Sequence, residues 1–382
     1  MKRYNNYTWE DAQQQLCQAA YFFEPNSEAE LAAVVHKARW ENKNITIVGS
    51  GYSTLPTLKK QTIALSTKGL NEIVEIDVER QQVRCQAGVL LNDLAKALVK
   101  AGLVLDTIHG HALQTVGEAV MSGTASNGFS DKNMSTSVVA LRCMNGRGEV
   151  VEVSKKEQLE VLCLSMGLLG VVLEVTLQCQ PLYTVCKEVV EMSMEEGLDY
   201  LKKEGLDKIA GQFIKSGRMQ LFQYRPIEKK DYAEALENGA QLGNAMSFVL
   251  KEQPFLMKTI SYAVPVTSYR SILKSLAALL IAHPMVQIDW SFSQKDKIWL
   301  SPAYQQDVVF IRLGFLSAFY QCNAVLLQQC QQLIAEHMVC PNWVSSGWTI
   351  QDLERYFPKW QDFLRVKAKL DPYHLFKNFY WK

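Results

Sequence analysis

A glycine-rich turn follows the β-branched run Ile45–Val48, and its composition is suited to binding a phosphate. The turn consists of Gly49, Ser50, Gly51, Tyr52 and Ser53. Two glycines in three positions allow a tight turn, and the backbone N–H groups of such a turn can surround an anion. A P-loop is excluded because the sequence contains no Gly-Lys-Ser/Thr, and the third glycine of a Rossmann dinucleotide turn is missing.

Two later segments have a similar character. The segment from Thr107 to Gly128 contains four glycines and a concentration of Ser, Thr and Asn, which predicts either a donor-rich path along a pyrophosphate or a long surface loop. His109 and His111 lie in this segment, where we favour a structural role but leave an acid–base role open, because imidazole titrates near neutrality. Farther on, Gly170 permits a close backbone approach before the strand-like run VVLEVTL.

Short strands and amphipathic helices are expected to position these segments. Asn26 or Ser27 caps a helix whose apolar residues recur at helical spacing: Leu31, Val34, Val35 and Ala38. Asn92 is expected to cap a second helix, which Gly102 ends. The predicted strands cover residues 45–48, 62–65, 73–76 and 83–87, and a hairpin joins 138–145 to 150–153. Beyond Pro181 the helical patterns are longer; helices are predicted at 271–282 and 350–369, and a strand at 308–313.

Composition excludes several classes of protein. The 382 residues carry 40 basic and 39 acidic side chains, which gives no electrostatic basis for binding nucleic acid. Nine cysteines lack CxxC spacing, so we expect neither a metal site nor a disulfide framework, but reduced core cysteines in a cytoplasmic protein. No apolar segment typical of a secretory signal follows the first cations, and the longest apolar run, 276–283, is far shorter than the roughly 20 residues of a membrane span.

In this order and spacing, the segments resemble the FAD-binding domain of the vanillyl-alcohol oxidase flavoprotein superfamily, and within it the aldonolactone and alditol oxidases. The likeness rests on GSGYS, AGVLLNDLAKALVKAGL, QTVGEAVMSGTASNG and MGLLGVVLEVTL, and later on WLSPAY at 299–304 and the closing pattern DPxxxFxN at 371–378. It implies an α+β fold of two lobes. One lobe is a PCMH-type FAD-binding domain at 10–182, and the other is a substrate or cap domain with an antiparallel sheet at 183–340. A C-terminal segment at 341–382 packs back on the FAD domain.

The resemblance also implies which residues contact the cofactor. The first turn would wrap the FAD pyrophosphate, and Val172 would lie on the adenine side. The path toward the isoalloxazine ring would be lined by Thr115, Gly117, Gly123, Thr124 and Asn127. Tyr52 stands where family members often carry the histidine that bonds covalently to the flavin, so we expect non-covalent FAD. Two departures, Glu118 for a second glycine and Ala125-Ser126 for His-Gly, are expected to loosen or reshape the site.

The catalytic pattern of the family is only partly kept. Its Glu-x-Arg, ten and eight residues before the tryptophan of WLSP, falls on Asp289 and Ser291, and its C-terminal lysine falls on Ser345. Asp289 is therefore the candidate catalytic residue, with a surface carboxylate as the alternative. Both family cations are missing. We favour the interpretation of Arg312 as an exposed charge on a strand over its use as a replacement cation. A place in the substrate pocket and a place in the core or rim are equally expected for Gln287, Trp290 and Trp343.

The resemblance implies an FAD-dependent oxidoreductase that dehydrogenates an alcohol or sugar-lactone-type hydroxyl by hydride transfer to flavin N5. Oxygen or another electron acceptor would reoxidise the flavin. The alternative is an FAD-binding protein that has lost sugar oxidation and serves as a binding or partner subunit. A cluster of C-terminal tryptophans and tyrosines is typical of a core and leaves a peripheral membrane contact open.

Overall fold

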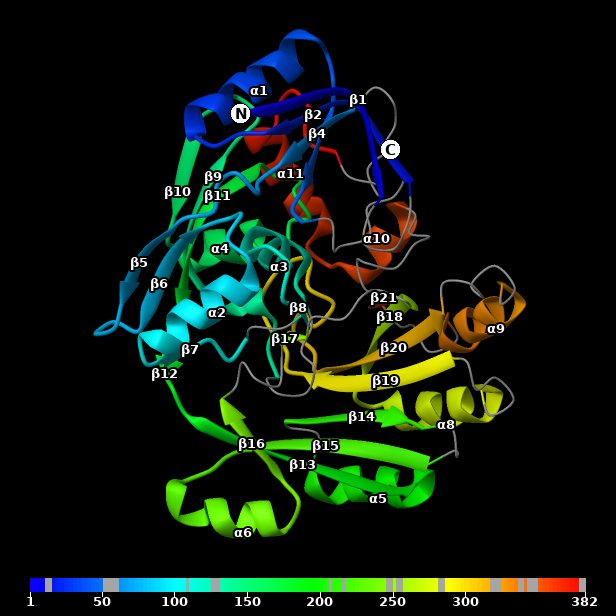
Figure 1. Cartoon of the computed structure of the whole chain (residues 1–382). Coiled ribbons are helices and arrows are strands. Elements are labelled where there is room, and N and C mark those ends of the chain that lie inside the picture. The colour runs from blue at the N-terminus through cyan, green and yellow to red at the C-terminus, as the bar shows by residue number, and fades with distance from the viewer. Residues whose placement is uncertain are drawn as a thin grey trace.

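The computed structural model describes residues 1–10, 16–50, 62–107, 110–124, 131–205, 208–214, 218–244, 250–251, 257–280, 286–316, 324–335, 340–341 and 350–377. The chain forms two lobes (Figure 1). The first lobe holds the N-terminal half together with the C-terminal helices, and the second is built on one large sheet. The mixture of helices with mainly antiparallel sheets confirms the expected α+β class.

The first sheet of the first lobe carries the glycine turn at one strand end. Its strand order is β1 (Lys2–Glu10), β2 (Leu16–Glu24), β4 (Ile63–Ser66) and β3 (Ile45–Val48). Strand β1 precedes the predicted domain start at residue 10 but belongs to this sheet. Helix α1 (Glu28–Trp40) begins after Ser27, whose hydroxyl accepts from the Glu30 N–H, and its predicted apolar face is buried against the sheet. The cap and the helix are thus confirmed.

The second sheet of this lobe is antiparallel. Its strand order is β10 (Val150–Val153), β9 (Val138–Met144), β11 (Val171–Gln178), β6 (Gln82–Gln86) and β5 (Ile73–Asp77). The predicted hairpin is confirmed as β9–β10, with Gly148 at φ +82° in its turn. Short elements complete the lobe: α2 (Leu91–Lys100), β7 (Leu103–Val104), β8 (Gly110–His111), α3 (Val116–Ser122), the 3₁₀ turn Met134–Ser137, α4 (Lys156–Leu162) and β12 (Gln180–Pro181).

Helix α2 begins differently from the prediction. Its N-cap is Leu90, and Asn92 lies within the helix, so the expected Asn92 cap is wrong. The backbone N–H groups of Leu91 and Asn92 donate to the carbonyls of Gln114 and Ala112 at 2.9 and 3.0 Å. Because a neighbouring segment bonds these first N–H groups, the helix needs no side-chain cap.

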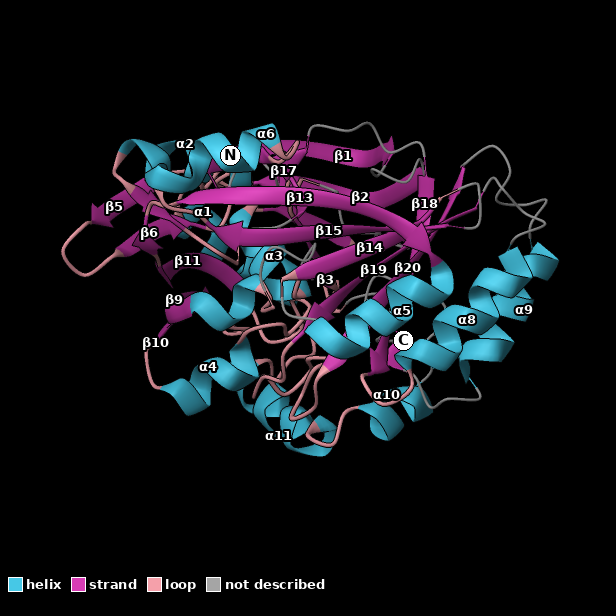
Figure 2. Cartoon of the chain, turned by 90° about the horizontal axis from the view of Figure 1, so that it is seen from below, coloured by secondary structure: helices cyan, strands magenta, loops and turns pink. Residues whose placement is uncertain are grey.

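The second lobe contains an antiparallel sheet, as expected, and this sheet has eight strands. Its order is β16 (Gln241–Asn244), β13 (Thr184–Ser193), β15 (Arg218–Pro226), β14 (Ile209–Phe213), β19 (Val286–Ser293), β20 (Val308–Leu316), β18 (Met257–Pro265) and β21 (Cys340–Pro341). Figure 2 shows β13, β15, β14, β19 and β20 next to one another. Helices α5 (Met194–Glu204), α8 (Tyr269–Leu280) and α9 (Ala324–Ala335) pack on the face away from the first lobe (Figure 1). The 3₁₀ turn Lys229–Asp231 and α6 (Tyr232–Glu237) follow β15, and β17 (Leu250–Lys251) pairs with β8 across the lobes.

The C-terminal segment returns to the first lobe. The single helix predicted over 350–369 is wrong, because Pro358 separates α10 (Ile350–Tyr356) from α11 (Trp360–Leu370). After α11 the chain runs beside β3, where the Ile45 N–H donates to the Leu375 carbonyl at 2.7 Å and the Lys377 N–H donates to the Ile45 carbonyl at 3.0 Å. Among the described residues, no helix is long and apolar enough to cross a membrane.

Candidate cofactor and substrate site

The first glycine turn begins directly at the end of β3, and its second residue, Ser50, contacts a carboxylate of the same chain. The N–H and the hydroxyl of Ser50 both donate to Oε2 of Glu118, at 3.1 and 2.9 Å. A Cβ at Gly49 would lie 2.6 Å from that oxygen and 2.6 Å from Oγ1 of Thr115, so a side chain at this position is excluded. Gly51, Tyr52 and Ser53 lie outside the described residues.

Helix α3 brings the second glycine segment against this turn. Thr115 is fully buried and caps the helix, accepting from the Glu118 N–H at 3.3 Å. The N–H of Gly117 donates to the Ala87 carbonyl at 2.8 Å, and a Cβ at Gly117 would lie 2.8 Å from the Ala87 Cβ. The structure therefore explains this glycine by close packing of α3 on the turn that follows β6, and its contact with the flavin stays a prediction.

The end of α3 also needs a glycine. Gly123 is left-handed at φ +61°, and a Cβ there would lie 2.2 Å from Cδ1 of Leu164. The next residue, Thr124, accepts a hydrogen bond from the Gln114 amide at 3.1 Å. Asn127 lies outside the described residues, so the path toward the isoalloxazine ring is described only in part.

The predicted adenine side lies on β11. Val172 is 5% exposed and pairs with Cys143 of β9, within the main core of the first lobe. A Cβ at Gly170 would lie 2.5 Å from the Met144 carbonyl oxygen, so the close approach expected at this glycine is to the backbone at the end of β9. Contact of Val172 with adenine stays a prediction.

The donors at the first turn fit a phosphate. A backbone N–H and a hydroxyl converge on one anionic oxygen, beside a glycine that leaves no room for a Cβ. Such a donor set is the one that phosphate oxygens use in turns of this kind. A bound FAD would be held at Gly49 and Ser50 by its pyrophosphate, and the acid group now in contact with Ser50 is that of Glu118.

The second lobe contributes a polar cluster on neighbouring strands. Asp289 of β19 and Arg312 of β20 are directly opposite in the antiparallel register, and the Arg312 Nε–H donates to Oδ1 of Asp289. The same guanidinium donates from Nη1 to the Ser291 hydroxyl at 3.1 Å. The side chains of Arg312 and Asp289 are 19% and 32% exposed, and Ser291 is fully buried.

This cluster lies on the sheet face that looks toward the first lobe. Side chains alternate along a strand, so Ser293 shares the face of Asp289 and Ser291. Its hydroxyl donates to the backbone carbonyl of Asp131 in the first lobe at 3.4 Å. The opposite face carries Trp290, which is fully buried in the core beneath α5, α8 and α9. Trp290 is thus a core residue.

The favoured interpretation of Arg312 as an exposed strand charge is wrong. Its guanidinium lies between Asp289 and Ser291, the two residues that the resemblance aligns with the family's Glu-x-Arg, and the small side chain of Ser291 leaves room for it. The alternation in VVFIRL put Arg312 on one face with Phe310 but could not show its partner. The position of the second missing cation, Ser345, lies outside the described residues, as does Trp343.

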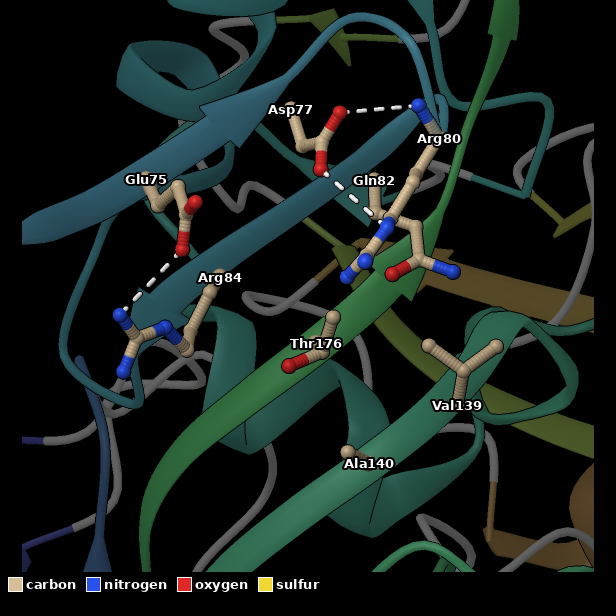
Figure 3. A pocket seen from close by; sticks show the side chains of 8 residues that line it. All are labelled: Glu75, Asp77, Arg80, Gln82, Arg84, Val139, Ala140 and Thr176. Carbon is tan, nitrogen blue, oxygen red and sulfur yellow. Dashed lines mark hydrogen bonds and ion pairs between the residues drawn. The ribbon is translucent and has the colours of Figure 1, made fainter.

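A charged hollow lies on the outer face of the five-stranded sheet, away from this site (Figure 3). Its charges pair within it: the Arg84 guanidinium contacts Glu75 at 3.3 Å, and Nε of Arg80 contacts Asp77 at 3.7 Å. The charged side chains of the hollow therefore contact one another. In the described part of the chain, no group of three or more His, Cys, Asp or Glu residues is placed to hold a metal ion.

Asp131 also joins the two lobes, beside a second hollow whose lining includes Asp106 and Lys208. Its carboxylate accepts from the Lys208 N–H at 3.0 Å, and its carbonyl accepts from the Gln294 N–H at 2.6 Å. Nearby, the Tyr183 hydroxyl donates to Asp106 at 2.8 Å, and burial raises the pKa of the Asp106 carboxyl above its ordinary value. The contacts hold the polar face of β19 against the first lobe.

Known families match both halves of the chain. A model described as FAD binding domain matches residues 19–154, and one described as D-arabinono-1,4-lactone oxidase matches residues 175–382. The chain is 26% identical to L-gulonolactone oxidase of Mus musculus, over 95% of this chain and 94% of that protein. It is 22% identical to L-gulono-1,4-lactone dehydrogenase of Mycobacterium tuberculosis, over 96% of each.

Solved structures share the fold. A Bermuda grass isoallergen, BG60, superposes with a TM-score of 0.78 at 12% identity, covering 95% of this chain and 90% of that one. A solvent-stable cholesterol oxidase gives a TM-score of 0.79 at 14% identity, covering 98% and 96%. Together with the two family models, the architecture leads to one conclusion: this chain belongs to the D-arabinono-1,4-lactone oxidase family and is an FAD-dependent oxidoreductase.

Proposed function

We propose that the protein dehydrogenates a hydroxyl group of a sugar lactone or related polyol, and that the cluster of Asp289, Ser291 and Arg312 binds the reacting end of that substrate. The observation that carries the proposal is the guanidinium of Arg312, which contacts both other residues on the sheet face turned toward the first lobe. The gulonolactone enzymes that the chain resembles act, by their names, on substrates of this class.

The roles of the three residues follow from their chemistry. FAD, when bound, supplies the two-electron acceptor for the hydride that leaves the substrate carbon. Arg312 supplies fixed positive charge, which favours the negative charge that develops as the reaction proceeds. Asp289 holds the guanidinium in place and provides carboxylate oxygens that can accept from a substrate hydroxyl.

The electron acceptor and the compartment are also proposals. Relatives are named both oxidase and dehydrogenase, which supports oxygen or another acceptor. We place the protein in the cytoplasm, and three buried free thiols support this: Cys85, Cys143 and Cys163. Burial raises the pKa of each of these thiols to about 12, so they stay protonated and inert.

Anaerobic mixing of the FAD-loaded protein with lactones, alditols and aryl alcohols tests the proposal. A lactone or polyol should bleach the flavin, and Arg312→Ala should slow bleaching on the order of 10²–10³-fold. Arg225→Ala is the matched control, since Arg225 donates to Glu188 at 2.7 Å in a cross-strand pair at the far side of the same sheet. Flavin content must stay the same in both variants.

Moving the cation back to its family position gives a second test. Ser291 is fully buried, so Ser291→Arg alone should crowd Arg312 and lower activity. The double change Ser291→Arg with Arg312→Ser should recover part of the rate. The proposal fails if Arg312→Ala reduces flavin as fast as wild type, or if no hydroxylated compound bleaches a fully loaded protein.

A further inference from the structure

The phosphate-type turn after β3 is already in contact with a carboxylate, that of Glu118. One oxygen of this carboxylate accepts both the N–H and the hydroxyl of Ser50, at 3.1 and 2.9 Å. The same oxygen would lie 2.6 Å from a Cβ at Gly49. The close approach that a glycine permits at this turn is therefore made by a side chain of the protein.

Glu118 is placed there by a helix that has little room to move. Its own N–H donates to Oγ1 of Thr115, which is fully buried. The neighbouring Gly117 is packed so closely on Ala87 that an added Cβ would lie 2.8 Å from the Ala87 Cβ. The carboxylate thus comes from a fixed point on α3, and Glu118 and Ser50 are both partly buried.

We propose that Glu118 is an internal competitor for the phosphate position at Ser50, so that the FAD pyrophosphate binds there only when the carboxylate leaves the Ser50 donors. The inference concerns cofactor loading. It rests on FAD as the cofactor and holds whichever substrate the second lobe binds. Glu118 is then a residue that sets cofactor affinity.

Two effects of Glu118 oppose FAD binding. The Ser50 N–H and hydroxyl must exchange one acceptor for another, so they contribute little net free energy to binding. The carboxylate and the pyrophosphate are both negative, and in a partly buried site their repulsion is several times stronger than in water. Glu118→Gln keeps the size of the side chain and removes its charge, so FAD should bind at least about tenfold more tightly.

The test is a titration of the flavin-free full chain, followed by quenching of flavin fluorescence. We expect Glu118→Gln to tighten FAD, and to tighten ADP by a similar factor when ADP is measured as a competitor of FAD. Riboflavin has no phosphate, so its affinity should stay within about twofold of wild type. Glu118→Asp keeps the charge and should bind FAD within a few-fold of wild type. High salt should narrow the difference between wild type and Glu118→Gln.

Glu157→Gln is the matched control, because Glu157 is an exposed acid in the first turn of α4, another seven-residue helix. It should leave all three affinities unchanged. The inference is overturned if Glu118→Gln, folded by circular dichroism, binds FAD no more tightly than wild type. It is also overturned if riboflavin tightens as much as FAD, because the side chain would then only block space. No substrate is present in these titrations, so their outcome is separate from that of the proposed reaction.

Discussion

The buried ion pair at the end of α11 is expected to hold the C-terminal segment on the first lobe. Lys367 and Asp371 are one helical turn apart, with side chains 2% and 0% exposed. The Lys367 ammonium donates to Asp371 at 2.9 Å and to the carbonyls of Leu168 and Phe376 at 2.8 and 2.9 Å. Asp371 also accepts the backbone N–H groups of Leu375 and Phe376, at 2.9 and 3.0 Å. We predict that Asp371→Ala strongly destabilises the protein.

The size of the effect follows from what the substitution leaves behind. Removing one partner of a buried pair costs about 3–5 kcal/mol, because the other charge stays buried. Burial lowers the pKa of Lys367 below its ordinary value, because an ammonium group is less stable away from water. Two buried N–H groups would also lose their acceptor, at about 1–3 kcal/mol each. Since these terms overlap, we expect about 5 kcal/mol, a large part of the stability of an ordinary domain.

Loss of the Lys367–Asp371 ion pair should also weaken the cofactor site. The Leu375 carbonyl accepts from the N–H of Ile45, the first residue of the strand that leads into Gly49 and Ser50. Asp371→Ala should therefore lower FAD affinity although Asp371 lies outside the glycine turn. Urea unfolding measured by tryptophan fluorescence gives the stability, and a flavin titration gives the affinity.

Two further substitutions on the same helix, Lys367→Met and Asp362→Ala, complete the test. Lys367→Met should cost less than Asp371→Ala, because Asp371 keeps its two backbone donors. The combined change Lys367→Met with Asp371→Asn should cost less than the sum of the single changes, since no buried charge remains. Asp362→Ala, which removes a half-exposed partner of Lys359 and Arg365, should change stability little. A loss for Asp371→Ala no larger than for Asp362→Ala would refute the reasoning.

Three further predictions follow. Burial raises the pKa of Asp296 to about 6 from 3.8, so the folded state binds this proton more tightly than the unfolded state, and the free energy of unfolding should fall as the pH rises from about 4 to about 6. In Asp296→Asn this fall should be smaller, and melting temperatures that change equally with pH in both proteins would contradict the prediction. Gly49→Ala should abolish FAD binding, because the added Cβ would lie 2.6 Å from Oγ1 of the buried Thr115, whereas Gly239→Ala, which has open space but a left-handed φ of +79°, should cost about 1–2 kcal/mol of stability and keep the flavin; equal flavin content in the two would count against the phosphate turn. With tyrosine at position 52, acid precipitation should release all flavin into the supernatant, and a fluorescent band on a denaturing gel would disprove non-covalent binding.

Short-range features of this protein could be read from its sequence. The buried face of α1, the strand entering the glycine turn and the β9–β10 hairpin all lie where the pattern of apolar residues and glycines predicts them. Periodicity within one element encodes which of its faces is buried, so neighbouring residues suffice. The prediction of one helix over 350–369 missed the break between α10 and α11, although Pro358 lies within the apolar pattern and indicates it.

The contacts that shape the site were decided only by the tertiary structure. Ser50 and Glu118 are 68 residues apart, and Arg312 is 21 residues from Ser291. A sequence pattern can place Arg312 on one face of a strand, but its partner depends on the register between β19 and β20, which the packing of the whole sheet sets. Likewise, the spacing of glycines predicted an anion-binding turn, whereas the carboxylate at that turn follows from how α3 packs against Ala87 and Thr115 caps it.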